Sequence, residues 1–179
     1  MIPRYKIQEI HDVWKTENKL ATWLKVELSH LESMARNITD KTITLKELNT
    51  IKEHACIDKE RWKEIEKETR HDVQAFVQML EESIPDNSGR WIHYGLTSSD
   101  IIDTSLVLMC KESLNVIEKY CSIALFNLSN LIKREESKCQ ILSRTHGKAA
   151  EVQTYRHVFI RWNSALRRGY DALRLAKTS

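Results

Sequence analysis

The feature that most limits how this chain can fold is a run from Ile101 to about Lys138 that contains no glycine and no proline. A single helix of about 38 residues would be about 57 Å long, which is too long to bury one apolar face against a small domain. The sequence therefore predicts a bundle of long helices. The apolar residues at helical spacing in this run are Ile101, Ile102, Leu106, Met109, Leu114, Ile117, Tyr120, Ile123, Ala124, Leu128, Leu131 and Ile132.

Only one other segment has the same character, and it runs from Tyr155 to Leu173. Two long helices leave apolar faces uncovered, so we infer that the bundle is completed by another subunit, by sequence outside this chain, or by both. We expect a nearly continuous helix over about 97–137. We also expect a homo-oligomer, because large exposed apolar patches are rare on monomers.

Shorter helices are predicted ahead of the long run. An apolar stripe from Leu20 to Ala35 predicts one helix, with Thr16 as its N-cap and with Glu27 among the charged residues away from the stripe. The polar segment 37–44 predicts a loop. Three further helices are expected, around Leu48 and Ile51, around Trp62 and Ile65 with Asp58 as N-cap, and from Val73 to Leu80.

The pattern as a whole predicts an all-α chain with two parts. A small N-terminal helical domain spans 1–96, and the first long helices of a central helical bundle span 97–179. The composition agrees, because the 179 residues include only 4 glycines and 2 prolines, far fewer turn formers than an all-β sandwich needs.

Composition also narrows the function. Lys and Arg number 28 against 25 Asp and Glu, a net charge of +3 that is too balanced to predict a nucleic-acid partner. No apolar stretch is long enough to predict a membrane span, and the first residues lack the apolar region of a secretory signal. The four scattered cysteines have no CxxC spacing, which predicts reduced thiols in a cytoplasmic protein and neither a disulfide framework nor a zinc site.

Three histidines lie at predicted element ends beside small polar residues, where sites are often assembled: His71, His93 and His146. Histidine transfers protons near neutral pH. Arginines, hydroxyls and the N–H groups that start the long helix suit an anion. The arginines are Arg4, Arg70 and Arg144, and the hydroxyls belong to Thr97, Ser98 and Thr145. The set fits acid–base chemistry on a polyanionic substrate. Alternatively, Thr97–Asp100 is only a helix cap and the histidines have no special role. The other histidines are expected on the solvated surface: His11, His30, His54 and His157.

Four short sequence motifs give a more specific indication of function. They are MIPRY at 1–5, ETRHDVQAF at 68–76, HYGLTSSD at 93–100 and RTHG at 144–147. In this order they resemble adenylosuccinate lyase, a family of the fumarase/aspartase superfamily, over the N-terminal part of the family's length. The HYGLTSSD segment is the most discriminating of the four.

The resemblance implies the elimination of fumarate from adenylosuccinate, and from the related succinyl carboxamide ribotide, in purine biosynthesis. The resemblance also implies that this reaction needs no cofactor and no metal. It implies that His146 is the general acid and that His71, beside Arg70 and Asp72, supports substrate orientation. It assigns the remaining substrate contacts to Arg4 and Tyr5 for the nucleotide, to Thr97 and Ser98 for the carboxylate end, and to His93 and Thr145 within the matched segments.

The segment around His146 differs from the family's usual sequence at six positions, which are Ser143, Lys148, Val152, Gln153, Tyr155 and Arg156. Lys148 places a cation where the family has an amide. The family's catalytic base is a serine on a mobile loop with no matching segment here, and its active sites combine residues from three subunits of a homotetramer. We therefore expect the 179-residue chain alone to be inactive.

Two other functions remain open. The chain could be a non-catalytic helical assembly or nucleotide-binding module that keeps the ancestral fold. The basic residues between Arg161 and Lys177 could form a nucleic-acid face, although they scatter around the predicted helix and Asp171 interrupts them, which favours a solvated exterior.

Overall fold

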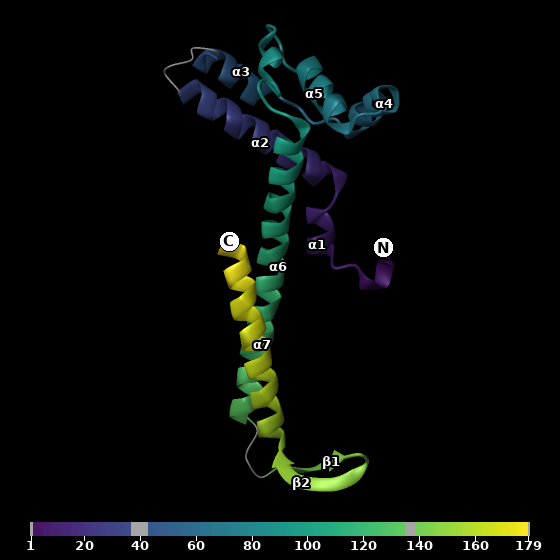
Figure 1. Ribbon diagram of the computed structural model, residues 1–179, viewed down its shortest axis with the longest axis vertical. Coiled ribbons are helices and arrows are strands. Elements are labelled where there is room, and N and C mark those ends of the chain that lie inside the picture. The colour runs from purple at the N-terminus through teal and green to yellow at the C-terminus, as the bar shows by residue number, and fades with distance from the viewer. Residues whose placement is uncertain (1, 37–42, 135–138, 179) are drawn as a thin grey trace. The chain divides into compact units, whose positions relative to one another are not determined.

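A computed structural model describes residues 2–36, 43–134 and 139–178 (Figure 1). The described chain is helical apart from one two-stranded sheet, which confirms the predicted all-α class. The elements in chain order are the 3₁₀ helix η1 (Pro3–Tyr5), α1 (Gln8–Val13), α2 (Thr16–Arg36), α3 (Leu45–His54), α4 (Lys59–Thr69), α5 (Asp72–Ser83), the 3₁₀ helix η2 (Ser88–Trp91), α6 (Ser98–Arg134), β1 (Gln140–Thr145), β2 (Lys148–Thr154) and α7 (Tyr155–Thr178).

The chain forms two compact units, Met1–Cys110 and Lys111–Ser179, and the division falls inside α6. The first unit has an apolar core built by α2, α3, α4, α5 and the start of α6. At its centre Phe76 of α5 is fully buried and meets Trp23 of α2 edge-on, with ring centroids 5.4 Å apart. These packed helices support the loops between them.

Capping residues set the starts of the short helices. Asp58 accepts hydrogen bonds from two backbone N–H groups at the start of α4, as predicted. Thr44 and Glu47 form a reciprocal capping box at the start of α3, which was not predicted. Thr16 is the first residue of α2, one position inside its expected place. Most of the predicted loop, residues 37–42, lies outside the described residues.

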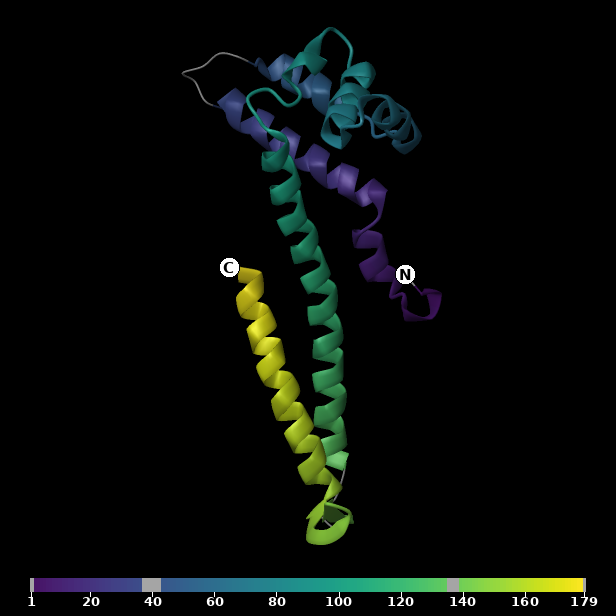
Figure 2. The ribbon, with the colours of Figure 1, turned by 45° about the vertical axis from the view of Figure 1, so that its right-hand side comes forward.

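The predicted long helix is confirmed as α6, which runs without a break from Ser98 to Arg134 (Figures 1 and 2). Residues 135–138 lie outside the described chain. In the second unit α7 runs antiparallel to the last part of α6. Lys177 pairs with Glu118 at 2.7 Å, and the Asn163 amide donates to the carbonyl of Leu125 near the other end. The Lys177 ammonium holds the pKa of the Glu118 carboxyl below its ordinary value.

The hairpin between the two long helices was not predicted. Strands β1 and β2 pair antiparallel, with Thr145 opposite Lys148, so only His146 and Gly147 form the loop. Both loop residues have positive φ (51° and 77°), the requirement of a tight hairpin turn of the mirror-image type. A His-Gly pair is a weaker signal for this turn than Asn-Gly or Asp-Gly. Both faces of the strands are largely exposed, so the sequence lacks the alternation of apolar and polar residues that usually marks a strand.

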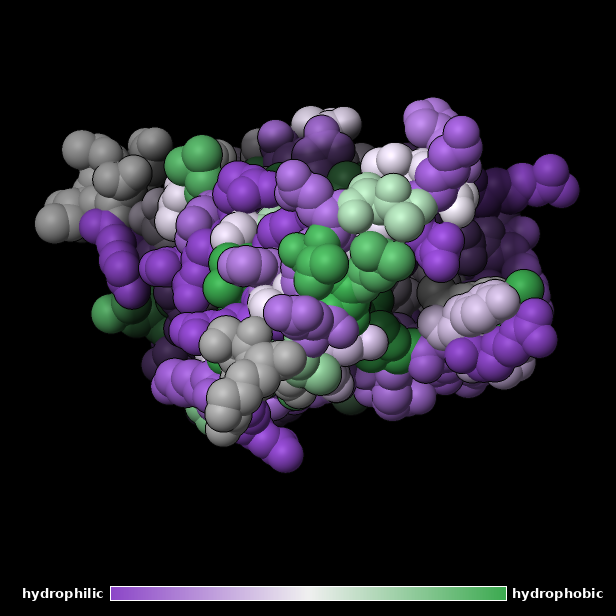
Figure 3. Space-filling model, turned by 90° about the horizontal axis from the view of Figure 1, so that it is seen from below, coloured by the Kyte–Doolittle hydropathy of each residue, from purple (hydrophilic) through white to green (hydrophobic). Residues whose placement is uncertain are grey.

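Many large apolar side chains of the second unit are exposed. They include Phe126 on α6 (66%), Trp162 on α7 (57%) and the cross-strand pair Leu142 and Val152. Figure 3 shows hydrophobic side chains at the surface among hydrophilic ones. Within the described ranges, no helix combines the length and the apolar character needed to cross a membrane.

Candidate functional site

The first group of predicted site residues lies where α4 ends and α5 begins. Arg70 ends α4 in the left-handed conformation, with φ 52°. His71 is the N-cap of α5, and its Nδ1 accepts a hydrogen bond from the Gln74 N–H at 3.2 Å. Since Nδ1 must be unprotonated to accept, the neutral ring carries its hydrogen on Nε2. His71 therefore presents an Nε2–H donor from an exposed helix start.

Asp72 connects this corner to α2. Its carboxylate lies 3.8 Å from the Lys19 ammonium, and its carbonyl accepts from the Trp62 indole N–H at 3.0 Å. The same ammonium lies over the rings of Trp23 and Trp62, at 4.5 and 5.0 Å from their centroids. Lys19 is thus held by one charge and two aromatic faces, and the backbone at Asp72 is fixed from two sides.

A cavity of about 300 Å³ lies beside Asp72 in the first unit. Its lining combines aromatic and apolar side chains with Lys19, Asp72 and Ser105. The Ser105 side chain is 1% exposed, and its hydroxyl has no hydrogen-bond partner within the described chain. The apolar part of the lining comes from Trp14, Trp23, Ile102, Leu106 and Met109.

The second group precedes α6. His93 has a positive φ of 62° and is tied to Glu27 of α2 through two hydrogen bonds, one from its backbone N–H (2.9 Å) and one at Nδ1 (2.8 Å). Next along the chain, the Asp100 carboxylate accepts from the Thr97 backbone N–H at 2.8 Å, which caps α6. Ser98 is the first helical residue. Thr97 and Ser98 therefore lie at the positive end of the helix dipole.

Glu27 was expected on the charged face of α2, and this is wrong, because its side chain is 0% exposed. The sequence did hold a signal: Glu27 follows Leu20 by seven residues and precedes Leu31 by four, which is the spacing of the buried face. His30, expected at the solvated surface, is only partly exposed and hydrogen-bonds the Tyr94 carbonyl at 3.0 Å.

Helix α2 supports both groups. Asp72 contacts it at Lys19 and His93 contacts it at Glu27, eight residues further on, or about 12 Å along the helix axis. Arg4 and Tyr5 lie in η1 and are exposed, with the Arg4 guanidinium 5.0 Å from the centre of the Tyr5 ring. In the part of the chain that the structure describes, neither forms a hydrogen bond or ion pair with residues 70–72 or 93–98.

The third group, Thr145 and His146, lies in the second unit at the exposed tip of the hairpin. The Arg144 guanidinium donates to the Gly147 carbonyl at 3.1 Å and braces the turn. His146 is exposed and has a positive φ. Thr145, His146 and Lys148 form a polar tip with no ion pair among the described residues.

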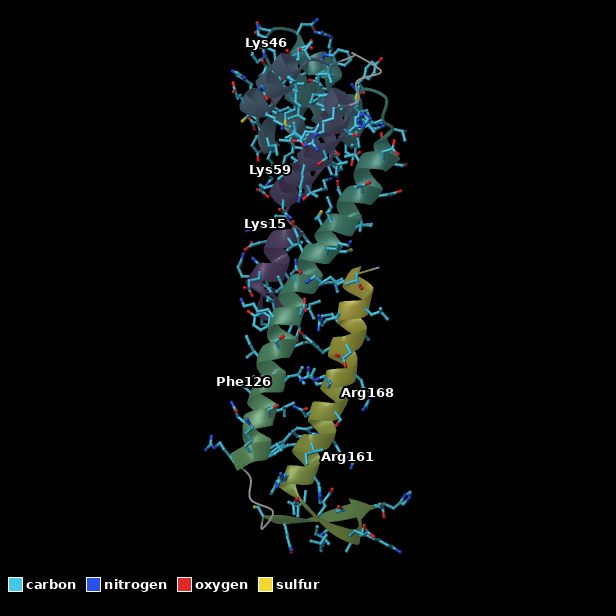
Figure 4. The ribbon with its side chains drawn as sticks, turned by 90° about the vertical axis from the view of Figure 1, so that its left-hand side faces the viewer. Lys15, Lys46, Lys59, Phe126, Arg161 and Arg168 are labelled. Atoms are coloured by element: carbon cyan, nitrogen blue, oxygen red, sulfur yellow. The ribbon has the colours of Figure 1, made fainter. Side chains whose placement is uncertain are left out.

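The basic residues of α7 do not form a continuous face. Arg161 and Arg168 lie seven residues apart (Figure 4) and line a hollow of about 490 Å³ together with Trp162 and Gln153. Arg174 lies near Glu118 instead, at 3.7 Å. Among the described residues, no group of three or more His, Cys, Asp or Glu side chains is placed to hold a metal ion.

Comparison with known proteins gives close sequence relatives. The chain is 33% identical to the adenylosuccinate lyase of Bacillus subtilis (strain 168) over 180 residues, covering 99% of the chain and 40% of the relative. It is 37% identical to the adenylosuccinate lyase of Methanocaldococcus jannaschii over 177 residues, covering 97% and 37%. The chain thus spans about two fifths of the length of these relatives.

Solved structures share the fold at lower identity. A fumarate lyase from Mesorhizobium sp. BNC1 matches with a TM-score of 0.82 at 20% identity, over 92% of this chain and 38% of that one. The β-carboxy-cis,cis-muconate cycloisomerase of Acinetobacter calcoaceticus sp. ADP1 matches with a TM-score of 0.80 at 17% identity, over 94% and 40%. A family model described as "Lyase" matches residues 6–179. The chain belongs to this lyase family, and adenylosuccinate lyases are among its relatives.

Proposed function

We propose that this chain supplies part of the active site of an adenylosuccinate lyase, which eliminates fumarate from adenylosuccinate and from the related succinyl carboxamide ribotide in purine biosynthesis. One observation carries the proposal: helix α2 contacts residues beside the starts of both α5 and α6, and each of these helix starts suits an anion. The starts of α5 and α6 present His71 and the Thr97–Ser98 pair, and α2 contacts residue 72 and residue 93 next to them. The similarity to the two lyases supports it.

In the proposed reaction, a base removes the proton next to a substrate carboxylate and the C–N bond breaks. His146 donates a proton to the departing nitrogen, so that fumarate and the amine are released. His71 orients the substrate through its Nε2–H, beside Arg70 and Asp72. Thr97 and Ser98 bind a carboxylate with hydroxyl and N–H donors at the positive end of α6.

The remaining assignments concern the nucleotide and the assembly. Arg4 and Tyr5 contact the nucleotide, and His93 and Thr145 complete the substrate contacts. We propose a cytoplasmic homo-oligomer. The residues assigned here include a proton donor and no base, so the 179-residue chain alone should release no measurable fumarate.

Calorimetric titration with AMP and adenylosuccinate tests the site without requiring turnover. We expect the chain to bind AMP and adenylosuccinate, and we expect Arg70→Ala and Ser98→Ala to abolish the binding of adenylosuccinate, which carries the carboxylates that AMP lacks. Ser99→Ala, one residue along α6 and exposed, is the matched control and should bind as the unaltered chain does. Equal binding by all four proteins would contradict the assignment.

A non-catalytic helical assembly module is the second candidate. The observation in its favour is the set of exposed apolar side chains on α6 and α7, such as Phe126 and Trp162. Absence of AMP binding together with tight self-association would favour this module over the lyase.

A further inference from the structure

Glu27 is fully buried, and both of its carboxylate oxygens bind the same residue. Oε2 accepts from the backbone N–H of His93 at 2.9 Å, and Oε1 lies 2.8 Å from the ring Nδ1. A buried carboxylate is stable only when donors satisfy it. Among the described residues, His93 is the only hydrogen-bond partner of this carboxylate, so the pair forms one unit.

We infer that Glu27 is a positioning residue, which holds the imidazole of His93 in a single tautomer and orientation. A carboxylate accepts hydrogen bonds, so Nδ1 carries the hydrogen and Nε2 is the nitrogen left for a ligand. The His93 side chain is 21% exposed, which leaves part of the ring accessible. The inference rests on the proposed function only for the identity of the ligand.

A second contact makes the orientation specific. One turn further along α2, His30 Nε2 donates to the Tyr94 carbonyl at 3.0 Å, and Trp91 packs edge-on against the Tyr94 ring at 5.1 Å. The backbone at His93 has a φ of 62°, a conformation that costs energy for a residue with a Cβ and persists only when its surroundings fix it. Glu27 and His30 together provide this fixation from one helix.

The Glu27→Gln variant gives a result that a merely structural role would not produce. The backbone N–H of His93 can only donate, so the glutamine oxygen must face it, and the glutamine NH₂ group then faces Nδ1. The ring must accept there and must move its hydrogen to Nε2. We expect ¹⁵N NMR of the histidine rings to show Nδ1–H in the unaltered chain and Nε2–H in the variant. Glu32→Gln, at a partly exposed residue of α2 that pairs with Lys52 and not with His93, should leave the tautomer unchanged.

Two results would overturn the inference: an Nε2–H tautomer at His93 in the unaltered chain, or the same tautomer before and after Glu27→Gln. If Glu27→Gln fails to fold, the His93→Asn variant tests the contact instead. The asparagine Nδ2–H can donate to Glu27 in place of the histidine Nδ1–H, and asparagine tolerates a positive φ. We expect this variant to melt close to the unaltered chain and His93→Ala to melt clearly lower. Equal loss in both would also overturn the inference.

AMP titration separates this inference from the proposed function. If AMP binds, Glu27→Gln should weaken its affinity about tenfold, as expected for a misdirected polar contact of about 1.4 kcal/mol, and an unchanged affinity would overturn the positioning role. If AMP does not bind the unaltered chain, the proposed function fails, while the tautomer measurement still decides the role of Glu27.

Discussion

The indole N–H of Trp91 donates to the carboxylate of Glu47 at 3.1 Å, which joins the end of η2 to the start of α3 across 44 residues of sequence. Glu47 also accepts from the hydroxyl and the backbone N–H of Thr44 and pairs with the Arg90 guanidinium. Together the Thr44 donors, and then the Trp91 indole, lower the pKa of Glu47 to about 2. The segment that leads to His93 is therefore anchored by Glu47 on α3 and by Glu27 on α2.

Glu47 makes the first unit sensitive to acid. Its folded pKa of about 2 lies below its ordinary value of 4.5, so its contribution to stability is complete above pH 4.5 and is lost as the pH falls from 4.5 towards 2. We expect Glu47→Gln to lower the free energy of unfolding by about 1–2 kcal/mol at neutral pH. Urea denaturation at several pH values should show this difference shrinking across that range. Glu53→Gln, exposed on the same helix, is the control, and a difference independent of pH would contradict the assignment.

Phe76 is the largest fully buried side chain of the core. Phe76→Ala should reduce the free energy of unfolding by about 3–5 kcal/mol, because it removes apolar burial and leaves a cavity against Trp23. Leu45→Ala, at a side chain that is 68% exposed, should change stability little. Chemical denaturation followed by tryptophan fluorescence measures both, and comparable losses would show that the core is not centred on α5.

His71 has a capping role and a proposed binding role, which substitution can separate. His71→Ala removes the acceptor for the Gln74 N–H and should cost about 1 kcal/mol of stability. His71→Asn keeps an N-cap acceptor and should remain as stable as the unaltered chain, yet it should lose AMP binding. Thermal melts combined with calorimetry give both readouts. An asparagine variant that binds AMP normally would remove His71 from the proposed site.

The hairpin turn allows the same separation at His146. Gly147→Ala forces a Cβ into a φ of 77° and should destabilise the turn by about 1–2 kcal/mol. His146→Asn creates the Asn-Gly pair that this turn favours, so the hairpin should persist without the imidazole. Hydrogen exchange at the amides of β1 and β2 should be faster in the first variant and unchanged or slower in the second. The reverse order would contradict the turn geometry.

The exposed apolar side chains of the second unit predict self-association. Light scattering should give a mass above one chain, and Phe126→Ser combined with Trp162→Ser should shift the mass towards the monomer. Ile2→Ser, at an exposed residue of the other unit, should have no effect. A compact monomer at high micromolar concentration would contradict the prediction.

The helices could be predicted from the sequence because their signals are local. The apolar spacing of α6 and the cap at Asp58 depend only on residues within one or two turns. The candidate site residues are a prediction from the sequence, which is possible because short motifs keep their residues in fixed order. Three of them, His71, His93 and Thr97, lie where the structure shows capped or hydrogen-bonded element ends.

The hairpin and the Glu27–His93 contact could not be predicted in the same way. The turn at His146 depends on two positive φ angles that histidine only tolerates, and the strands bury neither face. Glu27 and His93 lie 66 positions apart in the sequence, so no local pattern indicates their contact.

The sequence by itself determined the helical class, the order of the helices and the motif residues, since periodicity and capping act over a few residues. Only the tertiary structure decided that a glutamate joins the buried face of α2 and binds a distant histidine. Burying that carboxylate is tolerable only where the fold brings N–H donors to it, and those donors come from His93, far from Glu27 along the chain.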